Sequence, residues 1–283
     1  ISACLVGSEM CIRDRAELLK ELPYSVAYMV VSEAGASVYS ASKLAAEEFP
    51  EYDVSLRSAV SIARRLQDPL AELVKIDPQA IGVGQYQHDM PKAELSAALD
   101  GVVEDCVNHV GVDLNTASFS LLSHIAGINQ TIAKNIVAYR TENGAFTDRK
   151  QLKKVAKLGP KAYEQCAGFL RVPGAKNPLD NTAVHPESYG AAEQILRECG
   201  FQLADIAGQD RSEITSIAKQ HGIAAIAKKA GVGEPTVKDI IKELAKPGRD
   251  PRDELPPPLL RSGDIMELKD LKPGMELVGT CLL

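Results

Sequence analysis

The sequence has no tryptophan, and aromatic residues make up only 5% of its 283 residues. A large aromatic cage around a ligand is therefore not expected. No apolar run approaches the roughly 20 residues that a helix needs to span a bilayer, so we expect no membrane partner. The chain also has no basic surplus, because its formal net charge is −6. Any binding to nucleic acid must depend on a local basic patch.

Patterns that bind metal ions are missing from the sequence as well. The six cysteines include no pair at the spacing of zinc ligands, and the five histidines include no pair four residues apart. Most of the cysteines stand among apolar residues of helical segments. We therefore predict free, buried thiols in a reducing cytoplasm, with no metal site and no cofactor.

The length suits roughly two domains of ordinary size, and 45% apolar with 25% charged residues is typical of a globular protein. The two ends look foreign to such a protein. Residues 1–15, ISACLVGSEMCIRDR, resemble translated sequencing adapter, and the final CLL has the same character. We set residues 1–15 aside and expect the chain to be a fragment of a longer protein.

Residues 16–76 indicate a mixed α/β segment. SVAYMVV, from Ser25, is typical of a buried strand, and ASVYSAS, after Gly35, favours a second strand or an extended segment. LAAEEFP indicates a short helix. From Leu56 the apolar residues keep helical spacing, and Asp68-Pro69 then starts another helix with an N-cap and a proline in the first turn.

Residues 77–91 have no periodicity and predict a connector. The helix that follows is the clearest in the chain and ends at Gly111. Its predicted apolar face consists of Leu99, Val102, Val103, Cys106, Val107 and Val110. After residue 172 the sequence predicts helices over 173–246, a proline-rich linker over 247–262 and, over 263–283, the first strand of a truncated β domain.

Two segments about thirty residues apart repeat one organisation within a predicted domain of residues 92–172. LSHIAGINQTIAKNIVAYR starts at Leu122, and LKKVAKLGPKAYEQCAGFL starts at Leu152. Each predicts a helix, a tight turn and a second helix. The turn sequences IAGIN and VAKLG occupy the same place in the two segments, so we interpret the pair as a tandem helix–hairpin–helix domain.

The residues of the two turns indicate what the domain binds. Gly127, Asn129 and Gly159 suit the positive φ that such a turn needs, whereas Lys157 is an exception. The turn directs backbone N–H groups and the start of the next helix toward one point, which favours a phosphate. Such a contact recognises the nucleic-acid backbone rather than the bases.

The local charge supports this interpretation. Residues 130–171 contain nine basic and three acidic residues, a surplus of six positive charges in an acidic chain. The alternative is that these lysines only keep a helical face in water. The candidate nucleic-acid-binding residues are Gly127, Asn129, Lys134, Arg149, Lys153, Lys154, Lys157, Gly159 and Lys161.

Two known families resemble the repeat. DLNTASFSLLSHIAGI and IVAYRTENGAF are similar to the DNA-uptake receptor domain of competent bacteria and to the Tex family of transcription accessory proteins. The flanking sequences IDPQAIGVGQYQHDM, EQCAGFLRVPGAKNPLDNTAVHPESY and KPGRDPRDELPPP resemble the Tex family, and the resemblance extends from about residue 24 to residue 280.

The Tex resemblance implies a mainly α chain made of several parts. Residues 16–76 would be the end of a YqgF-type RNase H-like domain, 92–172 the hairpin domain, and 263–283 the start of an S1-type OB domain that binds RNA. It implies a cytoplasmic, bacterial factor that binds RNA or DNA, with the transcription machinery as a further partner and no small-molecule substrate.

An enzyme is the main alternative. RNase H-like nucleases hold two metal ions with a set of carboxylates. Glu33 follows the predicted strand, but Arg57 and Ser58 stand where the resemblance to an active resolvase would place an acid. We therefore predict an inactive remnant and no catalytic residue. A repair or recombination factor with an active nuclease, and a protein-docking scaffold, stay open as alternatives.

DNTAVHPESY also offers the residue types of a catalytic triad. These are Asp180, His185 and Ser188. Because asparagine and threonine favour turns and His185-Pro186 can open a helix, we interpret this stretch as structural.

Overall fold

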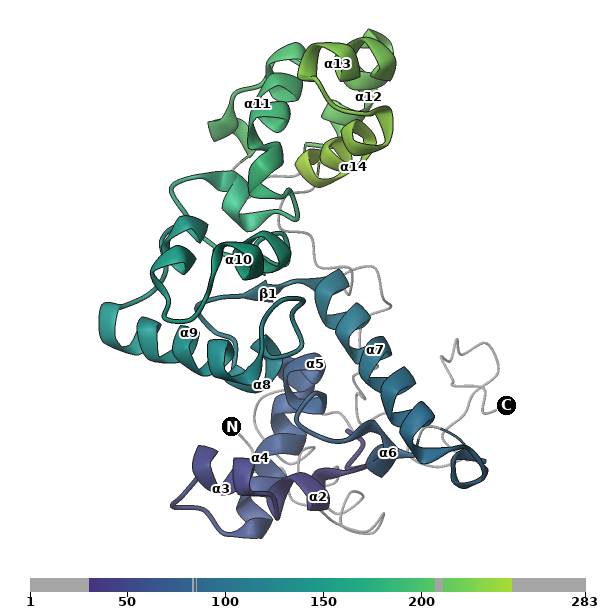
Figure 1. Cartoon of the computed structure of the whole chain (residues 1–283), viewed down its shortest axis with the longest axis vertical. Coiled ribbons are helices and arrows are strands. Elements are labelled where there is room, and N and C mark those ends of the chain that lie inside the picture. Colours follow the sequence, from purple (N-terminus) through teal and green to yellow (C-terminus); the bar gives the residue numbers. More distant parts are fainter. Residues whose placement is uncertain (1–30, 83, 85, 207–210, 246–283) are drawn as a thin grey trace, which may run out of the picture. The chain divides into compact units, whose positions relative to one another are not determined.

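The computed structural model describes residues 31–82, 84, 86–206 and 211–245 (Figure 1). The chain divides into two compact units, one of residues 1–84 and 256–283 and one of residues 85–255. The prediction of a mainly α fold is confirmed, and the described strands form one short parallel pair. The predictions for 1–15, 247–262 and 263–283, and almost all of the strand predicted from Ser25, lie outside the described residues.

The described part of the first unit is helical. Its elements are α2 (Ala36–Ser40), α3 (Lys43–Glu48), α4 (Val54–Gln67), α5 (Pro69–Leu73) and α6 (Pro78–Ile81). The predicted cap of α5 is confirmed, because the Asp68 side chain accepts a hydrogen bond from the Ala71 amide at 3.1 Å and Pro69 opens the helix. The connector predicted at 77–91 contains α6 and the single 3-10 turn η1 (Gln87–Asp89).

The prediction of a strand or extended segment after Gly35 is wrong, because these residues form α2. Gly35 turns the chain with a φ of 73°, and a Cβ there would lie 2.8 Å from Cγ2 of Ile76. Ala36, Tyr39 and Ser40 are then buried together. Their spacing of three and four residues is that of one helical face, which the valine and serines of the segment had obscured.

Helix α4 confirms the helical spacing from Leu56, but its buried face is not the apolar one. Leu56 and Leu66 are 52% and 45% exposed, whereas Ser61, Ile62 and Arg65 are buried. Polar side chains are tolerated on this face because they are bonded. Arg65, for instance, donates to the carbonyls of residues 32 and 34 at 2.7 and 2.9 Å.

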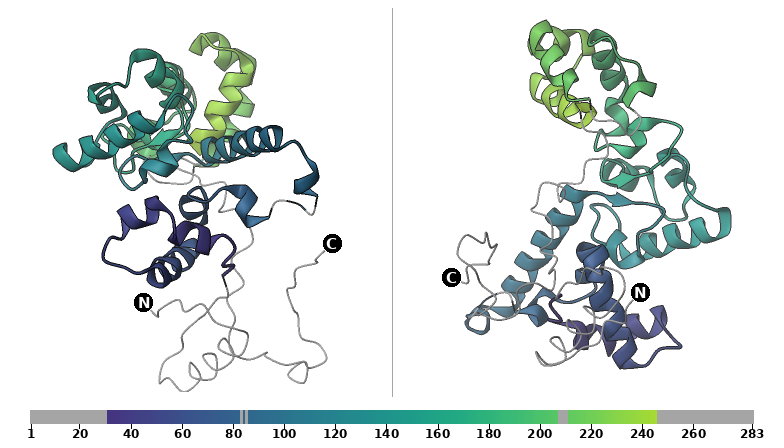
Figure 2. Two further views of the ribbon diagram at one scale, coloured as in Figure 1. Left: turned by 60° about the horizontal axis from the view of Figure 1, so that its bottom comes forward. Right: turned by 180° about the vertical axis from the view of Figure 1, so that it is seen from behind.

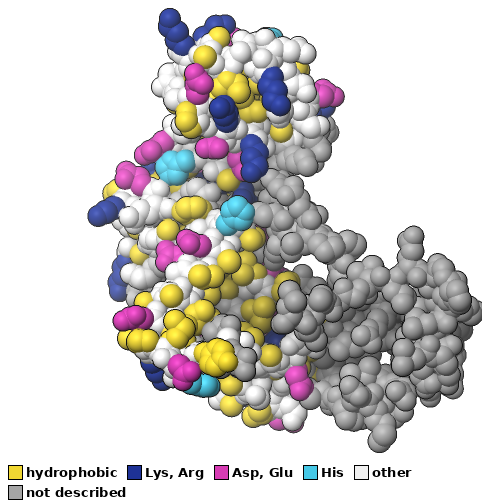
Figure 3. Space-filling model, turned by 90° about the vertical axis from the view of Figure 1, so that its right-hand side faces the viewer, with side chains coloured by type: hydrophobic (Ala, Val, Ile, Leu, Met, Phe, Trp, Pro, Cys, Tyr) yellow, Lys and Arg dark blue, Asp and Glu magenta, His cyan; other side chains and the backbone are white. Residues whose placement is uncertain are grey.

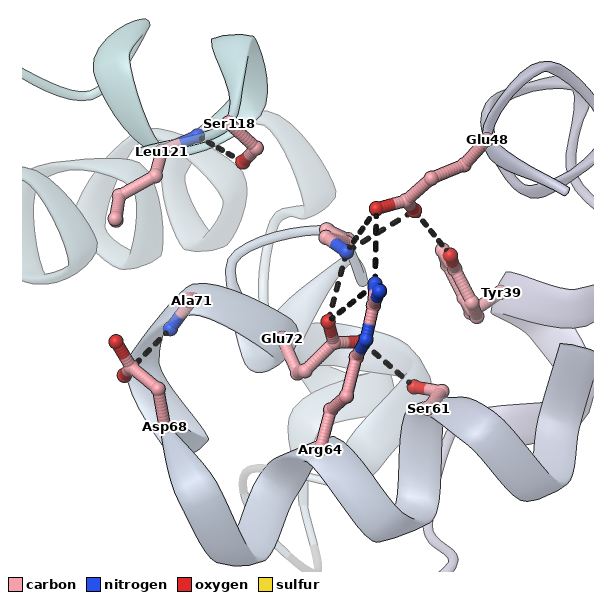
Figure 4. A network of polar contacts seen from close by, with 10 residues as sticks. Tyr39, Glu48, Ser61, Arg64, Asp68, Ala71, Glu72, Ser118 and Leu121 are labelled. Atoms are coloured by element: carbon pink, nitrogen blue, oxygen red, sulfur yellow. Dashed lines mark hydrogen bonds and ion pairs between the residues drawn. The ribbon is translucent and has the colours of Figure 1, made fainter. Parts of the chain in front are cut away.

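A cluster of ionised side chains joins α3, α4 and α5 (Figure 4). The ammonium of Lys75 is nearly buried and lies 2.8 Å from a carboxylate oxygen of Glu48 and 2.8 Å from one of Glu72. Arg64 lies 3.4 and 3.8 Å from the same two carboxylates, and Tyr39 donates to Glu48. Burial acts to raise the pKa of Glu48, but hydrogen bonds from Lys75 and Tyr39 outweigh it and lower that pKa.

The first α-helix of the second unit is the long helix α7 (Lys92–Val110), which ends at Gly111 as predicted, at a φ of 78°. The predicted apolar face of α7 is mostly not buried. Val107 is fully buried, whereas Val102 is 57% exposed and Cys106 is exposed as well. The covered end of the helix is its last turn, where Asn108 accepts from the Ala126 amide at 3.2 Å.

The hairpin region follows α7 and is enclosed by the two strands. Its elements are β1 (Val112–Asp113), α8 (Phe119–Leu122), α9 (Gln130–Asn143), η2 (Arg149–Lys154), α10 (Pro160–Cys166) and β2 (Leu170–Arg171). Strands β1 and β2 pair in parallel, with Val112 opposite Leu170. The pair brings the start and the end of the region together, so the two hairpins lie within one closed unit.

The helices predicted beyond residue 173 are confirmed. They are η3 (Pro178–Asn181), η4 (Pro186–Ser188), α11 (Tyr189–Glu198), η5 (Leu203–Ile206), α12 (Glu213–His221), α13 (Ile223–Ala230) and α14 (Glu234–Ala245). Helices α11 to α14 enclose a core that includes Ile195, Leu196, Ile214, Val237 and Leu244 (Figure 2). Cys166 and Cys199 are buried, as expected of most cysteines here, whereas the prediction fails for the exposed Cys106.

Candidate nucleic-acid interface

The two hairpins have the same backbone geometry at an offset of thirty residues. Gly127 and Lys157 both adopt a left-handed conformation, with φ of 79° and 65°. In the first hairpin the Ile128 amide donates to the Ile125 carbonyl at 3.0 Å, and in the second the Leu158 amide donates to the Val155 carbonyl at 3.2 Å. Ile128 and Leu158 are both buried. The tandem motif predicted from the sequence is therefore present as two matching turns.

The residue that closes each turn stands at the N-cap position of the next helix. Asn129 has a φ of −88°, and its side chain accepts from the Ile132 amide at 2.9 Å. Gly159 has a φ of −77° and precedes Pro160 at the start of α10. The prediction that Asn129 and Gly159 supply a positive φ is therefore wrong, because an N-cap residue needs an extended backbone. Lys157, predicted to be the exception, takes the left-handed position instead.

Each hairpin is fixed against the second helix of the other motif. The Asn135 side chain in α9 donates to the Ala156 carbonyl of the second hairpin at 2.7 Å. Gln165 in α10, thirty residues later, packs against the first hairpin, where a Cβ at Gly127 would lie 2.7 Å from Gln165 Cβ and 3.2 Å from the Ala162 carbonyl oxygen. Gly127 is thus required both by its φ and by this close approach. The reciprocal contacts fix the two turns in one frame.

The basic residues of the region separate by type. All six lysines between residues 130 and 171 are exposed. The three arginines instead donate to backbone carbonyls: Arg140 to Leu114 at 2.9 Å, Arg171 to Val110 at 3.3 Å, and Arg149 to several. Burial lowers the pKa of Arg140. The charge available to a ligand is therefore that of Lys134, Lys150, Lys153, Lys154, Lys157 and Lys161.

Arg149 is not a surface residue, so its prediction as a binding residue is wrong. It is fully buried, and its guanidinium donates to the carbonyls of Leu170 at 2.7 Å, Val184 at 2.8 Å and Thr182. It also donates to the Tyr189 hydroxyl at 3.0 Å. The planar fork of arginine suits this cluster of acceptors, and charge counting cannot separate such a residue from the exposed lysines beside it.

Two of the lysines lie along aromatic rings. The ammonium of Lys134 is 5.2 Å from the Phe119 ring centroid, and that of Lys153 is 4.6 Å from the Tyr163 ring centroid. These cation–π contacts limit the motion of the side chains at the surface. The face of the molecule shown in Figure 3 carries basic and acidic side chains intermixed.

The residues of the supposed triad have separate partners. Asp180 accepts from the Arg149 amide at 3.1 Å and from the Tyr189 hydroxyl at 2.5 Å. His185 Nε2 lies 2.9 Å from the Glu164 carbonyl oxygen, and its Nδ1 accepts from the Glu187 amide at 3.3 Å. The structural interpretation of this stretch, as turns and the start of η4, is confirmed. Among the described residues, no group of three His, Cys, Asp or Glu side chains could hold a metal ion, and no helix could cross a membrane.

A third glycine-bearing turn was missed from the sequence. Between α13 and α14, Gly231 has a φ of 68° and is followed by Val232 and Gly233. The signal was the pattern glycine–apolar–glycine in AGVGEP. The residue after this turn is Glu234, whereas Gln130 and Pro160 follow the other two.

Three family models match the chain. A helix-hairpin-helix motif matches residues 107–171, an HHH domain matches 177–252, and a Tex protein YqgF-like domain matches 6–67. These matches place the chain in the class of helix–hairpin–helix proteins.

Comparison with curated relatives identifies the family within this class. The chain is 56% identical over 264 residues to the "Transcriptional accessory protein Tex" of Neisseria gonorrhoeae, a match that covers 93% of the chain and 34% of the relative. It is 54% identical over 272 residues to "Protein tex" of Bordetella pertussis, covering 96% and 33%. The chain belongs to the Tex family and spans about a third of the length of these relatives. It is also 42% identical over 335 residues to human "S1 RNA-binding domain-containing protein 1", covering 98% and 34%.

Proposed function

We propose that this chain is the nucleic-acid-binding part of a transcription accessory factor, and that it binds the sugar–phosphate backbone of RNA or DNA without sequence preference. The observation that carries the proposal is the pair of matching hairpins, each leading directly into a helix and surrounded by exposed lysines. The names of the Neisseria and Bordetella relatives support a role in transcription. Such a role would give the protein a partner in the transcription machinery of a bacterial cytoplasm.

The proposed site in the first hairpin consists of Gly127, Asn129 and Lys134. Gly127 shapes the turn, and Asn129 caps the 14-residue helix α9. Amides of the first helical turn that have no partner within the helix, together with the helix dipole, favour an anion at this end. Lys134 adds an exposed positive charge one turn further along.

The proposed site in the second hairpin depends more on side chains. Gly159 leaves open space at the start of α10, since nothing lies within 4 Å of a Cβ built there. Lys153, Lys154, Lys157 and Lys161 are exposed around it. Because Pro160 has no amide proton, these lysines supply most of the attraction for a phosphate in this half.

Salt dependence tests the proposal directly. Fluorescence anisotropy with labelled DNA duplexes and single-stranded RNAs of several sequences should give similar affinities within each type. Each affinity should fall with salt at a slope of about 0.9 per neutralised phosphate on a duplex, because counterions are released. Equal affinity at low and high salt would rule out the backbone site and would leave protein docking as the better explanation.

We further propose that the YqgF-like part of this chain does not cleave nucleic acid. Glu33 is exposed in the loop before α2, and Arg57 in α4 donates to the Phe49 carbonyl at 3.0 Å. Incubation of a labelled substrate with magnesium or manganese should give no products. Cleavage that is lost in the Glu33→Gln variant would support the nuclease alternative instead.

A further inference from the structure

Lys157 has an unusual backbone for its residue type. Within the part of the chain that the structure describes, it is the only residue other than glycine with a positive φ, at 65°. A side chain disfavours this conformation because Cβ crowds the following carbonyl oxygen. The equivalent residue of the first hairpin is glycine, Gly127, at a φ of 79°. The second hairpin therefore keeps a lysine where glycine would form the same turn without strain.

Packing does not require the lysine. In the first hairpin a side chain is excluded, because a Cβ at Gly127 would lie 2.7 Å from Gln165 Cβ. At the equivalent place in the second, the shorter Asn135 donates to the neighbouring Ala156 carbonyl at 2.7 Å, and Lys157 is exposed. The turn is therefore held by Asn135, and the side chain of Lys157 faces solvent.

The fold does not require the charge of Lys157 either. Among the residues that the structure describes, no carboxylate forms an ion pair with it. Four other lysines, at positions 150, 153, 154 and 161, stand within seven residues of it in the chain and are exposed as well. An unpaired cation among like charges, on a strained backbone, contributes nothing to the fold that can be seen. Such local strain is found where a ligand uses the residue.

We propose that Lys157 is an affinity-determining residue of the nucleic-acid site, with its ammonium at the tip of the second hairpin in contact with a phosphate. The proposal rests on the proposed function of the hairpin domain. The first hairpin then binds phosphate through backbone amides, and the second adds a point charge at the equivalent place. A lysine ammonium sets little geometric demand, so this contact suits RNA and DNA alike.

The test separates charge from strain with two substitutions in the full chain. Lys157→Ala removes the charge and keeps the strained φ, whereas Lys157→Gly removes both. Lys150→Ala is the matched control, because Lys150 is another exposed lysine of the same region but lies at the start of η2, seven residues before the turn residue. The probe is a short fluorescein-labelled DNA duplex, with a single-stranded RNA as a second probe, and thermal unfolding is followed by circular dichroism.

The expected result is that Lys157→Gly raises the unfolding temperature by about 2–4 °C and yet weakens binding. Both variants should lose about tenfold in affinity for either probe, and the salt slope on the duplex should fall by about one phosphate contact. Lys150→Ala should lose less.

Two results would overturn the role of Lys157 while leaving the proposed function in place. One is parental affinity in both Lys157 variants; the other is an equal loss in Lys150→Ala. An unchanged unfolding temperature in Lys157→Gly would overturn the argument from strain. If the parent chain itself shows no salt-dependent binding, the proposed function and the role of Lys157 both fail, so the parent measurement distinguishes the two failures.

Discussion

The two regions matched by helix–hairpin–helix models contain the same kind of turn, but the charged residues around the turn differ. Residues 107–171 contain nine basic and four acidic residues, whereas residues 177–252 contain ten basic and eleven acidic residues. The described lysines of both regions are exposed, but in the second region Lys229 is paired with Glu198 at 2.7 Å and Glu234 follows the turn. The hairpin is therefore primarily a structural turn. Under the proposed function, it becomes an anion site only where the residues around it leave positive charge unpaired.

The largest effect is expected where the two regions meet, at Arg149. Its guanidinium joins the end of the first region to the segment before α11, so Arg149→Met would leave several buried carbonyls without a donor. The free energy of unfolding should fall by about 3–5 kcal/mol. Urea unfolding followed by circular dichroism measures this. Lys150→Met, at the exposed neighbour, should change it by less than about 0.5 kcal/mol.

Charge reversal tests the contrast in binding. Lys134→Glu with Lys161→Glu alters the first region, and Lys228→Glu with Lys238→Glu makes the same change in net charge in the second, where both lysines are also exposed. The first pair should lower affinity for every nucleic acid tested by at least about tenfold and reduce the salt slope by about two contacts. The second pair should have a much smaller effect. Equal losses in the two pairs would show that overall charge, rather than the hairpin site, governs binding.

The two glycines of the first region should respond differently to valine. Gly127→Val adds a side chain at a φ of 79° against Gln165, and should cost about 1–3 kcal/mol of stability from backbone strain alone, with more from the clash. Gly159→Val meets open space at a φ of −77° and should leave the unfolding temperature close to that of the parent. A similar loss of stability in both variants would mean that the second turn is tighter than it is in this structure.

The smallest expected effect is on the reactivity of the cysteine thiols, which reports local opening of the fold. Burial raises the pKa of Cys166 to about 12, so its thiol is neutral at pH 8 as well as inaccessible. Burial also raises the pKa of Cys199 in the second region. Of the three cysteines that the structure describes, iodoacetamide at pH 8 should therefore modify Cys106 first, and Cys166 and Cys199 only after unfolding. Early labelling of Cys166 but not of Cys199 would show that the first region opens more readily than the second. Mass spectrometry after digestion distinguishes the sites.

The hairpins could be predicted from the sequence because the residue pattern that defines them is local. Apolar spacing, a glycine and a capping residue within five positions are enough to define the turn around Gly127. The burial of Arg149 could not be predicted in this way, since its acceptors at Leu170, Thr182 and Val184 come together only in the folded chain. The same holds for α7, where a regular apolar stripe was visible but nothing in the sequence indicated how little of it the neighbouring residues cover.

Because each hairpin packs against the second helix of the other motif, the two halves of the first region are arranged like the subunits of a domain-swapped dimer, but within one chain. Asn135 reaches into the second hairpin, Gln165 covers the first, and β1 pairs with β2. Gly144, between the two motifs, is exposed, and nothing lies within 4 Å of a Cβ built there. A chain cut there should hold together as two complementing fragments, whereas either half alone would lack the surface on which its own turn is packed.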